Sequence, residues 1–182
     1  ANLFIKWYVP KIIPKKNIKI FSKNLKIIFS KLLSKLKNRN VVFVHRDFHV
    51  SNLMKYNNKI AVIDSQDALY GNIAYDLASL IDDVRYKSSK KLKNEIYNYF
   101  VEIKKVNLIK FKNDFEILSV LRNIKIIGIF TRLSVRDNKK KYLKLIPYTW
   151  KLIELRINEN NNFKELKLIL DIYFSKKIRK LK

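Results

Sequence analysis

Cysteine is absent from this chain of 182 residues, and glycine occurs only twice, as Gly71 and Gly128. Without cysteine the chain can form neither a disulfide bond nor a thiolate metal site, and such a composition fits a reducing compartment. We therefore expect a cytoplasmic protein. Proline is also scarce, with three residues, so interruptions of secondary structure by proline are confined to a few places.

Long apolar runs are missing as well, because lysines interrupt every hydrophobic stretch. A transmembrane helix needs about 20 consecutive, predominantly apolar residues, so we expect no membrane partner. Residues 1–7 lack the basic-then-apolar order of a signal peptide. They also lack an initiator methionine, and we expect the chain to be a fragment or a processed product.

Acidic residues are few: 15 Asp and Glu stand against 40 Lys and Arg, which gives a net charge of +25. A net charge of that size favours nucleic acid or an anionic membrane as a partner. Here the lysines spread over nearly every segment, and Ile, Asn and Lys are all abundant, which indicates a compositional drift of the whole proteome. We therefore do not expect nucleic acid as a partner, and a non-catalytic basic binding module stays as an alternative.

Hydrophobic residues make up 48% of the chain, and aromatic residues 13%, which is enough for a folded core. The length fits one domain or one large lobe of a bigger enzyme. Residues 1–21 contain Pro10 and Pro14, which predicts a short helix or turn followed by an extended linker. Apolar residues then recur at three- and four-residue steps, which predicts a helix that starts at Ser22 as its N-cap.

Short β-branched and aromatic runs predict three strands, over residues 41–44, 52–56 and 59–63, with a turn at Asn57–Asn58. Beyond Asp67 we predict helices only, over residues 74–81, 88–105, 112–134, 139–156 and 162–180. Asp82–Asp83 is predicted as the solvated end of the first of these. The fold class is therefore α+β and mostly helical.

Polar residues fill the loop after the first predicted strand. The loop is His45-Arg46-Asp47-Phe48-His49-Val50-Ser51-Asn52, and Ile63-Asp64 ends the third predicted strand. The five-residue step from Asp47 to Asn52, with a later aspartate, matches the protein-kinase loop H-R-D-L-x-x-x-N and its metal-binding aspartate. This spacing predicts transfer of a phosphoryl group.

Each residue of the pattern fits one task of that chemistry. A carboxylate beside a hydroxyl nucleophile accepts its proton, and we predict this role of catalytic base for Asp47. Magnesium prefers hard oxygen ligands, and we predict Asn52 and Asp64 as those ligands, with ATP or another nucleoside triphosphate as the phosphoryl donor. The alternative is a polar loop whose Asp and Asn side chains form turn hydrogen bonds.

Five neighbouring residues are predicted to support the loop. His45 and His49 lie four apart, but without the helix and glutamate of the zinc motif H-E-x-x-H. We expect His45 to be buried and hydrogen-bonded and His49 to lie near the substrate, with Arg46 between them. Asp67 either reaches the site or caps a turn, and Asp76 is expected to hold the loop through hydrogen bonds.

Three segments, residues 44–54, 62–68 and 75–80, together resemble the aminoglycoside phosphotransferase and choline kinase superfamily. Within it the pattern is most similar to bacterial anomeric sugar kinases that phosphorylate N-acetylmuramate and N-acetylglucosamine. Residues 7–10 and 121–137 resemble the same subfamily. One departure is Ser65, which stands where the family usually has an aromatic residue after the metal-binding Asp.

The resemblance implies a fold and further contacts. Residues 1–182 are expected to form the C-terminal lobe of a protein-kinase-like fold, with short strands that carry the catalytic loop packed on a helical bundle. Arg122, Asn123 and Arg132 are expected to contact sugar or phosphate. The alternatives for these three are a solvated helix face or an ion pair between helices.

Family members also have an N-terminal lobe with a phosphate-covering loop and a lysine for the ATP phosphates. No such glycine loop or strand lysine precedes residue 41, so we expect this lobe to be missing here and supplied in cis or in trans. A split gene, a truncated sequence or a decayed pseudoenzyme would each explain its absence.

The overall expectation is an ATP- and Mg²⁺-dependent phosphotransferase whose acceptor is a hydroxyl group of a small molecule. An amino sugar is the expected acceptor because of the resemblance. Two alternatives from other classes are a basic binding module and an inactive kinase-like scaffold.

Overall fold

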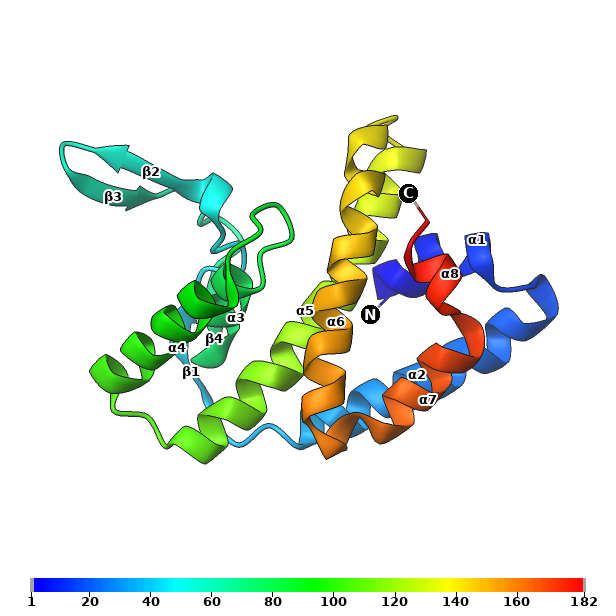
Figure 1. The fold of residues 1–182 in the computed structure, drawn as a ribbon, viewed down its shortest axis with the longest axis horizontal. Helices are drawn as coiled ribbons and strands as arrows, with labels where there is room; N and C mark the ends of the chain where they lie inside the picture. Colours follow the sequence, from blue (N-terminus) through cyan, green and yellow to red (C-terminus); the bar gives the residue numbers. More distant parts are fainter. Residues whose placement is uncertain (1, 182) are drawn as a thin grey trace. The chain divides into compact units, whose positions relative to one another are not determined.

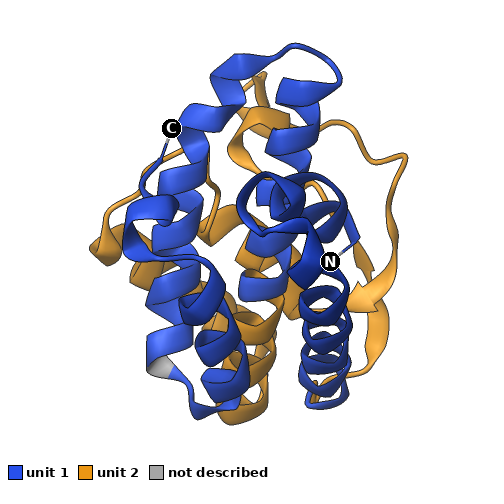
Figure 2. Cartoon of the chain, turned by 90° about the vertical axis from the view of Figure 1, so that its right-hand side faces the viewer, with its two compact units in different colours: residues 1–35, 120–182 blue, residues 36–119 orange. Residues whose placement is uncertain are grey.

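The computed structural model describes residues 2–181, apart from the side chain of Glu159. The chain forms two compact units, unit 1 with residues 1–35 and 120–182 and unit 2 with residues 36–119, coloured separately in Figure 2. Helices predominate, and the strands form two antiparallel pairs, so the α+β, mostly helical prediction is confirmed. In the described part of the chain, no helix combines the length and apolar character needed to cross a membrane.

Figure 1 shows the elements in chain order. They are the π-helix η1 (Phe4–Tyr8), α1 (Val9–Ile12), α2 (Lys15–Ser34), β1 (Asn40–Val44), the 3₁₀-helix η2 (Val50–Asn52), β2 (Leu53–Tyr56), β3 (Lys59–Val62), β4 (Leu69–Asn72), α3 (Ala74–Ile81), α4 (Lys90–Lys104), α5 (Leu108–Val135), η3 (Lys140–Leu145), α6 (Ile146–Glu159), η4 (Asn161–Phe163), α7 (Lys164–Tyr173) and α8 (Lys176–Arg179). The predicted helices 88–105 and 112–134 are confirmed as α4 and α5. The last two predicted helices each divide into shorter ones.

The linker predicted over residues 1–21 is wrong, because this segment is helical from Phe4 and α2 already begins at Lys15. Pro10 is accommodated in the first turn of α1, where a proline removes no hydrogen bond. Pro14 stands directly before α2, and Ser22, predicted as the N-cap, lies inside that helix. The prolines therefore begin helices here and do not interrupt them.

Aromatic rings form the core that holds the first residues in unit 1. Phe4 stacks on Tyr8 with ring centroids 5.3 Å apart, and both rings contact Trp150 and Phe174. The Trp150 Nε1–H donates to the Tyr8 hydroxyl at 3.2 Å, and burial raises the pKa of Tyr8. A side chain at Gly128 would place its Cβ 2.3 Å from the backbone nitrogen of Phe4, so only glycine allows this close approach.

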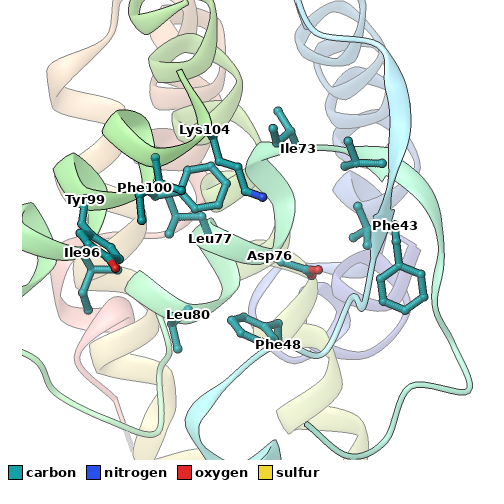
Figure 3. Close-up of a pocket in the computed structure, with 13 residues that line it drawn as sticks. Phe43, Phe48, Ile73, Asp76, Leu77, Leu80, Ile96, Tyr99, Phe100 and Lys104 are labelled. Carbon is teal, nitrogen blue, oxygen red and sulfur yellow. The ribbon is translucent and has the colours of Figure 1, made fainter. Parts of the chain in front are cut away.

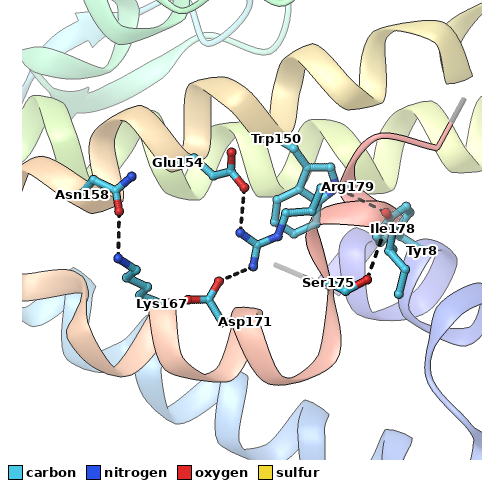
Figure 4. A network of polar contacts seen from close by, with 9 residues as sticks. All are labelled: Tyr8, Trp150, Glu154, Asn158, Lys167, Asp171, Ser175, Ile178 and Arg179. Carbon is cyan, nitrogen blue, oxygen red and sulfur yellow. Dashed lines mark hydrogen bonds and ion pairs between the residues drawn. The ribbon is translucent and has the colours of Figure 1, made fainter.

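One arginine fixes the end of the chain to the same ring cluster (Figure 4). The guanidinium of Arg179 lies over the Trp150 ring, 5.1 Å from its centroid. It donates to Glu154 Oε1 at 2.7 Å and to Asp171 Oδ1 at 2.6 Å. Because the Arg179 side chain is largely buried, these two charge-assisted bonds stabilise α6, α7 and α8 as one group of helices.

Unit 2 has a small core of its own, in which the apolar face of α3 packs on the start of α5. Its fully buried members are Ala74, Leu77, Ala78, Ile81, Phe111, Phe115 and Leu118. Aromatic residues of α4 cover this core, with Phe100 stacked on Phe111 at a centroid distance of 5.4 Å. The core holds α3 in place, and α3 supplies the loop with acceptors.

The prediction that only helices follow Asp67 is wrong for Leu69–Asn72, which form strand β4 and pair antiparallel with β1. Gly and Asn, half of this four-residue segment, are depleted in strands, so its own strand signal is weak. A side chain at Gly71 would place its Cβ 2.9 Å from Val44 Cγ2. The glycine thus lets the two strands pack closely, whereas the sequence suggested a loop.

A single carboxylate, Asp114 of α5, joins the segment before β1 to the end of β4. It accepts hydrogen bonds from the backbone amides of Lys37 and Asn38, each at 2.8 Å, and from the Asn72 side-chain amide at 2.8 Å. Burial by itself raises the pKa of Asp114, but the hydrogen bonds outweigh it and the pKa lies below its ordinary value.

We expect Asp114→Asn to lower the free energy of unfolding at neutral pH by about 2 kcal/mol. The single amide oxygen of asparagine is a weaker acceptor and cannot replace both carboxylate oxygens, so one buried N–H group is left without a partner. A carboxyl with a lowered folded-state pKa stabilises the fold above its unfolded-state pKa, and this stability is lost as the pH falls through the folded-state pKa. The difference between wild type and variant should therefore shrink below pH 3.8, the ordinary pKa. Urea unfolding at neutral and acid pH measures it, and an equal difference at both would contradict the assignment.

Candidate functional site

At the start of the polar loop, directly after β1, two consecutive backbone amides donate to the same carboxylate. The amide of His45 donates to Asp76 Oδ2 at 2.6 Å, and the amide of Arg46 donates to Asp76 Oδ1 at 3.0 Å. Asp76 lies in the first turn of α3. The backbone φ of Arg46 is 73°, in the left-handed region that a residue other than glycine adopts only when its surroundings enforce it. The expected hydrogen bonds between Asp76 and the loop are therefore present.

The loop then turns back so that Asn52 lies beside Asp47. The Asn52 Nδ2–H donates to the Asp47 backbone carbonyl at 2.9 Å, and the Asn52 amide donates to the His49 carbonyl at 2.9 Å. The Asn52 side chain is buried, and Asp47 is half-buried. Because the side-chain nitrogen Nδ2 is a donor and is already bonded to the Asp47 carbonyl, Oδ1 is the side-chain atom of Asn52 that can bind a cation.

The hairpin of β2 and β3 brings the later aspartate to the same place. Its turn is Asn57–Asn58, with φ of 46° and 58°, as in the predicted two-residue turn. At its open end the Ile63 amide donates to the Asn52 carbonyl at 3.0 Å, and the Ile63 carbonyl contacts His45 Nε2 at 3.0 Å. Asp64 follows directly, with a φ of 71°.

The other supporting residues lie around this junction. His45 and His49 are both buried, and the His45 ring lies edge-on to Phe48. Arg46 Nη1 donates to the backbone carbonyl of Asp67 at 3.1 Å, so the backbone of Asp67 contacts the loop. The segment between β3 and β4, which includes Asp67, is thereby held against Arg46 at the start of the loop.

The residues present fit a magnesium ion. The Oδ1 atom of Asn52 and the exposed carboxylate of Asp64 are both hard oxygen donors. Gln66 Nε2 donates to Asp64 Oδ1. Within residues 2–181, no three His, Cys, Asp or Glu side chains gather as a metal-binding group. A magnesium ion held by Asn52 and Asp64 would therefore complete its shell with phosphate and water oxygens.

The prediction that Asp82–Asp83 is a solvated helix end is wrong, since the two residues are 0% and 1% exposed. Asp82 accepts from Ser119 Oγ at 2.6 Å and forms an ion pair with Lys93 at 3.0 Å. The sequence contains a signal for the burial of Asp82 that the prediction does not use. Lys93 lies on the apolar stripe of its helix with Ile96 and Phe100, and a lysine there needs a buried acid as its partner.

An apolar pocket of about 470 Å³ lies next to the loop within unit 2 (Figure 3). Strand β1 and helices α3 and α4 supply most of its lining, and Phe48, directly after Asp47, is part of its wall. Apart from Asp76, Lys104 and Tyr99 the lining is apolar. Sugar hydroxyls need polar partners, so we do not place a sugar acceptor in this pocket.

Arg122, Asn123 and Arg132 belong to unit 1, whereas the loop belongs to unit 2. Arg122 and Asn123 are buried, so the alternative of a solvated helix face is wrong for these two. Neither amide atom of Asn123 has a hydrogen-bond partner among the residues that the structure describes. Their contact with a substrate stays a prediction.

We expect neutral His45 to be the Nε2–H tautomer. The Ile63 carbonyl is an acceptor only, so the ring nitrogen 3.0 Å from it must carry the proton. Nitrogen-15 NMR of the histidine side chains distinguishes the two tautomers, with His49 as an internal comparison. An Nδ1–H tautomer for His45 would contradict the hydrogen bond that joins the loop to Ile63.

Comparison with known proteins gives two findings. Residues 16–99 match the model of the phosphotransferase enzyme family. N-acetylmuramate/N-acetylglucosamine kinase of Neisseria meningitidis is 35% identical over 157 residues, which cover 80% of this chain and 46% of the relative. The proteins of the same name from Caulobacter vibrioides and Pseudomonas aeruginosa are 30% and 31% identical, over 63% and 69% of this chain.

The matched segments make up 33% and 39% of the Caulobacter and Pseudomonas proteins. The chain therefore spans less than half the length of these curated relatives. The segment that matches the family model, residues 16–99, includes the loop described above.

Proposed function

Since the chain belongs to the phosphotransferase enzyme family through residues 16–99, we propose that it transfers the γ-phosphoryl group of ATP. The proposed acceptor is a hydroxyl group of an amino sugar, and the proposed location is the cytoplasm. The acceptor class follows the names of the relatives, which are N-acetylmuramate/N-acetylglucosamine kinases. The observation that supports this most is the return of Asn52 to the Asp47 backbone, with Asp64 next to the same junction.

The proposed roles divide the chemistry among three side chains. Asp47 accepts the proton of the attacking hydroxyl and orients it, and its half-buried position leaves it accessible to a substrate. Asn52 and Asp64 present oxygen atoms to a magnesium ion. When bound, that ion neutralises charge on the phosphate oxygens of ATP. Asp76 keeps the loop in place, because it holds the two amides before Asp47.

We further propose that residues 1–182 are a kinase-like C-terminal lobe and that a nucleotide-binding lobe, in cis or in trans, completes the site. The strands of unit 2 support this, because they expose large apolar side chains, among them Phe43, Tyr56, Ile60 and Tyr70. A lone two-stranded hairpin is only marginally stable in water. A second lobe would cover these side chains and supply the phosphate contacts that the sequence lacks before residue 41.

On the acceptor side, Arg122, Asn123 and Arg132 are proposed to contact sugar or phosphate. A buried amide such as that of Asn123 normally has hydrogen-bond partners. This unsatisfied amide is the support for the assignment.

Asp47→Asn should lower the rate of phosphoryl transfer to N-acetylglucosamine or N-acetylmuramate by about 10²- to 10⁴-fold, since the hydroxyl loses its proton acceptor. Nucleotide affinity should stay within about twofold, because Asp47 is not proposed to contact ATP. The rate is measured by phosphate transfer in the longest natural protein that includes this chain, and the affinity by calorimetry.

The matched control is Glu95→Gln, which removes an exposed carboxylate from α4 and should leave both quantities unchanged. Wild-type turnover in Asp47→Asn would remove Asp47 from the reaction. Loss of nucleotide affinity in the same variant would show that its effect is on binding.

Residues 1–182 alone should bind ATP weakly, with a Kd of about 1 mM or higher, because half of the phosphate contacts belong to the proposed second lobe. Titration calorimetry with Mg²⁺ and ATP measures this. Micromolar binding would contradict the need for a second lobe.

A further inference from the structure

Helix α3 offers the loop a carboxylate at each of its two ends. Asp76, in the first turn, accepts from the amides of His45 and Arg46 where the loop begins. Asp83, two residues beyond the last residue of α3, accepts from the amide of Val50 at 3.3 Å, near the end of the loop. Both contacts join the helix to backbone amides, so they fix the path of the chain and not merely one side chain.

Asp83 is held in position by a second set of bonds. Its Oδ1 accepts from the Arg85 amide at 3.0 Å and lies 3.4 Å from Arg85 Nη1, while Oδ2 faces Val50. The side chain is 2% exposed. Two oxygens with separate partners leave the carboxylate little freedom to rotate.

The preceding residue fixes the turn that presents Asp83. Asp82 accepts from Ser119 Oγ of α5 at 2.6 Å and pairs with Lys93 Nζ of α4 at 3.0 Å. Breaking a buried ion pair leaves an uncompensated charge and is strongly unfavourable. The end of α3 is therefore tied to both neighbouring helices, and Asp83 cannot shift without disturbing this pair.

Val50 is the first residue of η2, the three-residue helix that ends with Asn52. The Val50 amide is the donor by which Asp83 holds the start of this helix. If that bond is lost, η2 loses its tie to the end of α3, and the Asn52 side chain is held by its bond to the Asp47 carbonyl and through the bond of its backbone amide to the His49 carbonyl. The direction of Asn52 Oδ1 matters because this atom is the proposed magnesium ligand.

We propose that Asp83 is a positioning residue for phosphoryl transfer: it holds Val50 and thereby aims the Asn52 amide oxygen at the metal. This inference rests on the proposed function. It gives the two ends of α3 separate tasks, with Asp76 placing the segment that includes Asp47 and Asp83 placing the segment that includes Asn52.

The test compares Asp83→Ala, Asp83→Asn and the control Glu95→Gln in the longest natural protein that includes this chain. In Asp83→Ala, hydrogen exchange at the Val50 amide should become about tenfold faster, since its acceptor is gone. Exchange at His45 and Arg46 should be unchanged, because Asp76 still holds them. The Mg²⁺ concentration for half-maximal rate should rise about tenfold, with the KM for the sugar unchanged.

Asp83→Asn keeps a carbonyl oxygen for Val50, so it should show a smaller rise in the Mg²⁺ requirement than the alanine variant. It also serves as the test if Asp83→Ala does not fold. Unchanged exchange at Val50 in Asp83→Ala overturns the proposal, as does an unchanged Mg²⁺ requirement in Asp83→Asn. Faster exchange throughout unit 2, with equal losses in Mg²⁺ and sugar dependence, overturns it as well. A wild-type protein without phosphoryl transfer overturns the proposed function itself, whereas an active wild type with insensitive variants overturns only the role of Asp83.

Discussion

The amides of His45 and Arg46 follow the last residue of β1, where no partner strand continues to accept their hydrogen bonds. A buried amide without an acceptor is costly, and the carboxylate of Asp76 satisfies both amides at once. The left-handed conformation of Arg46 persists because these bonds enforce it. The direction of the loop, and with it the position of Asp47, follows from this one carboxylate and from the core that holds α3.

Unit 2 uses its scarce acids as internal acceptors. Only 15 Asp and Glu occur in the whole chain, yet Asp82, Asp83 and Asp114 are fully buried, and each accepts hydrogen bonds that join segments distant in sequence. The lysines that dominate the composition are mostly exposed. A drift toward lysine can alter a solvated surface at little cost, whereas replacing a buried acceptor would leave its donors without a partner. The net charge therefore gives little information about function, whereas the few buried acids show which segments the fold holds together.

The features that the sequence predicts are those with a local cause: the loop spacing from Asp47 to Asn52, the Asn57–Asn58 turn, and the long helices α4 and α5. The features that it hides depend on partners elsewhere in the chain. Strand β4 exists because β1 pairs with it, and Gly71 serves close packing, not a turn. Among the described residues the positive φ angles belong to Asn, Asp, Arg and Lys, and to neither glycine, so glycine was a misleading guide to loops here.

Asp76 lies in the first turn of α3, whereas Asp82 leaves the helical conformation and Asp83 follows it in the turn. The helix and the turn after it therefore together supply the acceptors for both ends of one loop. Helical periodicity places Lys93, Ile96 and Phe100 on one stripe of α4, where the lysine meets Asp82. This spacing is visible in the sequence, but it acquires meaning only once a second element is known to lie opposite. The acids after α3 are buried because the loop and α4 cover this helix end, and neither neighbour is visible in the local sequence.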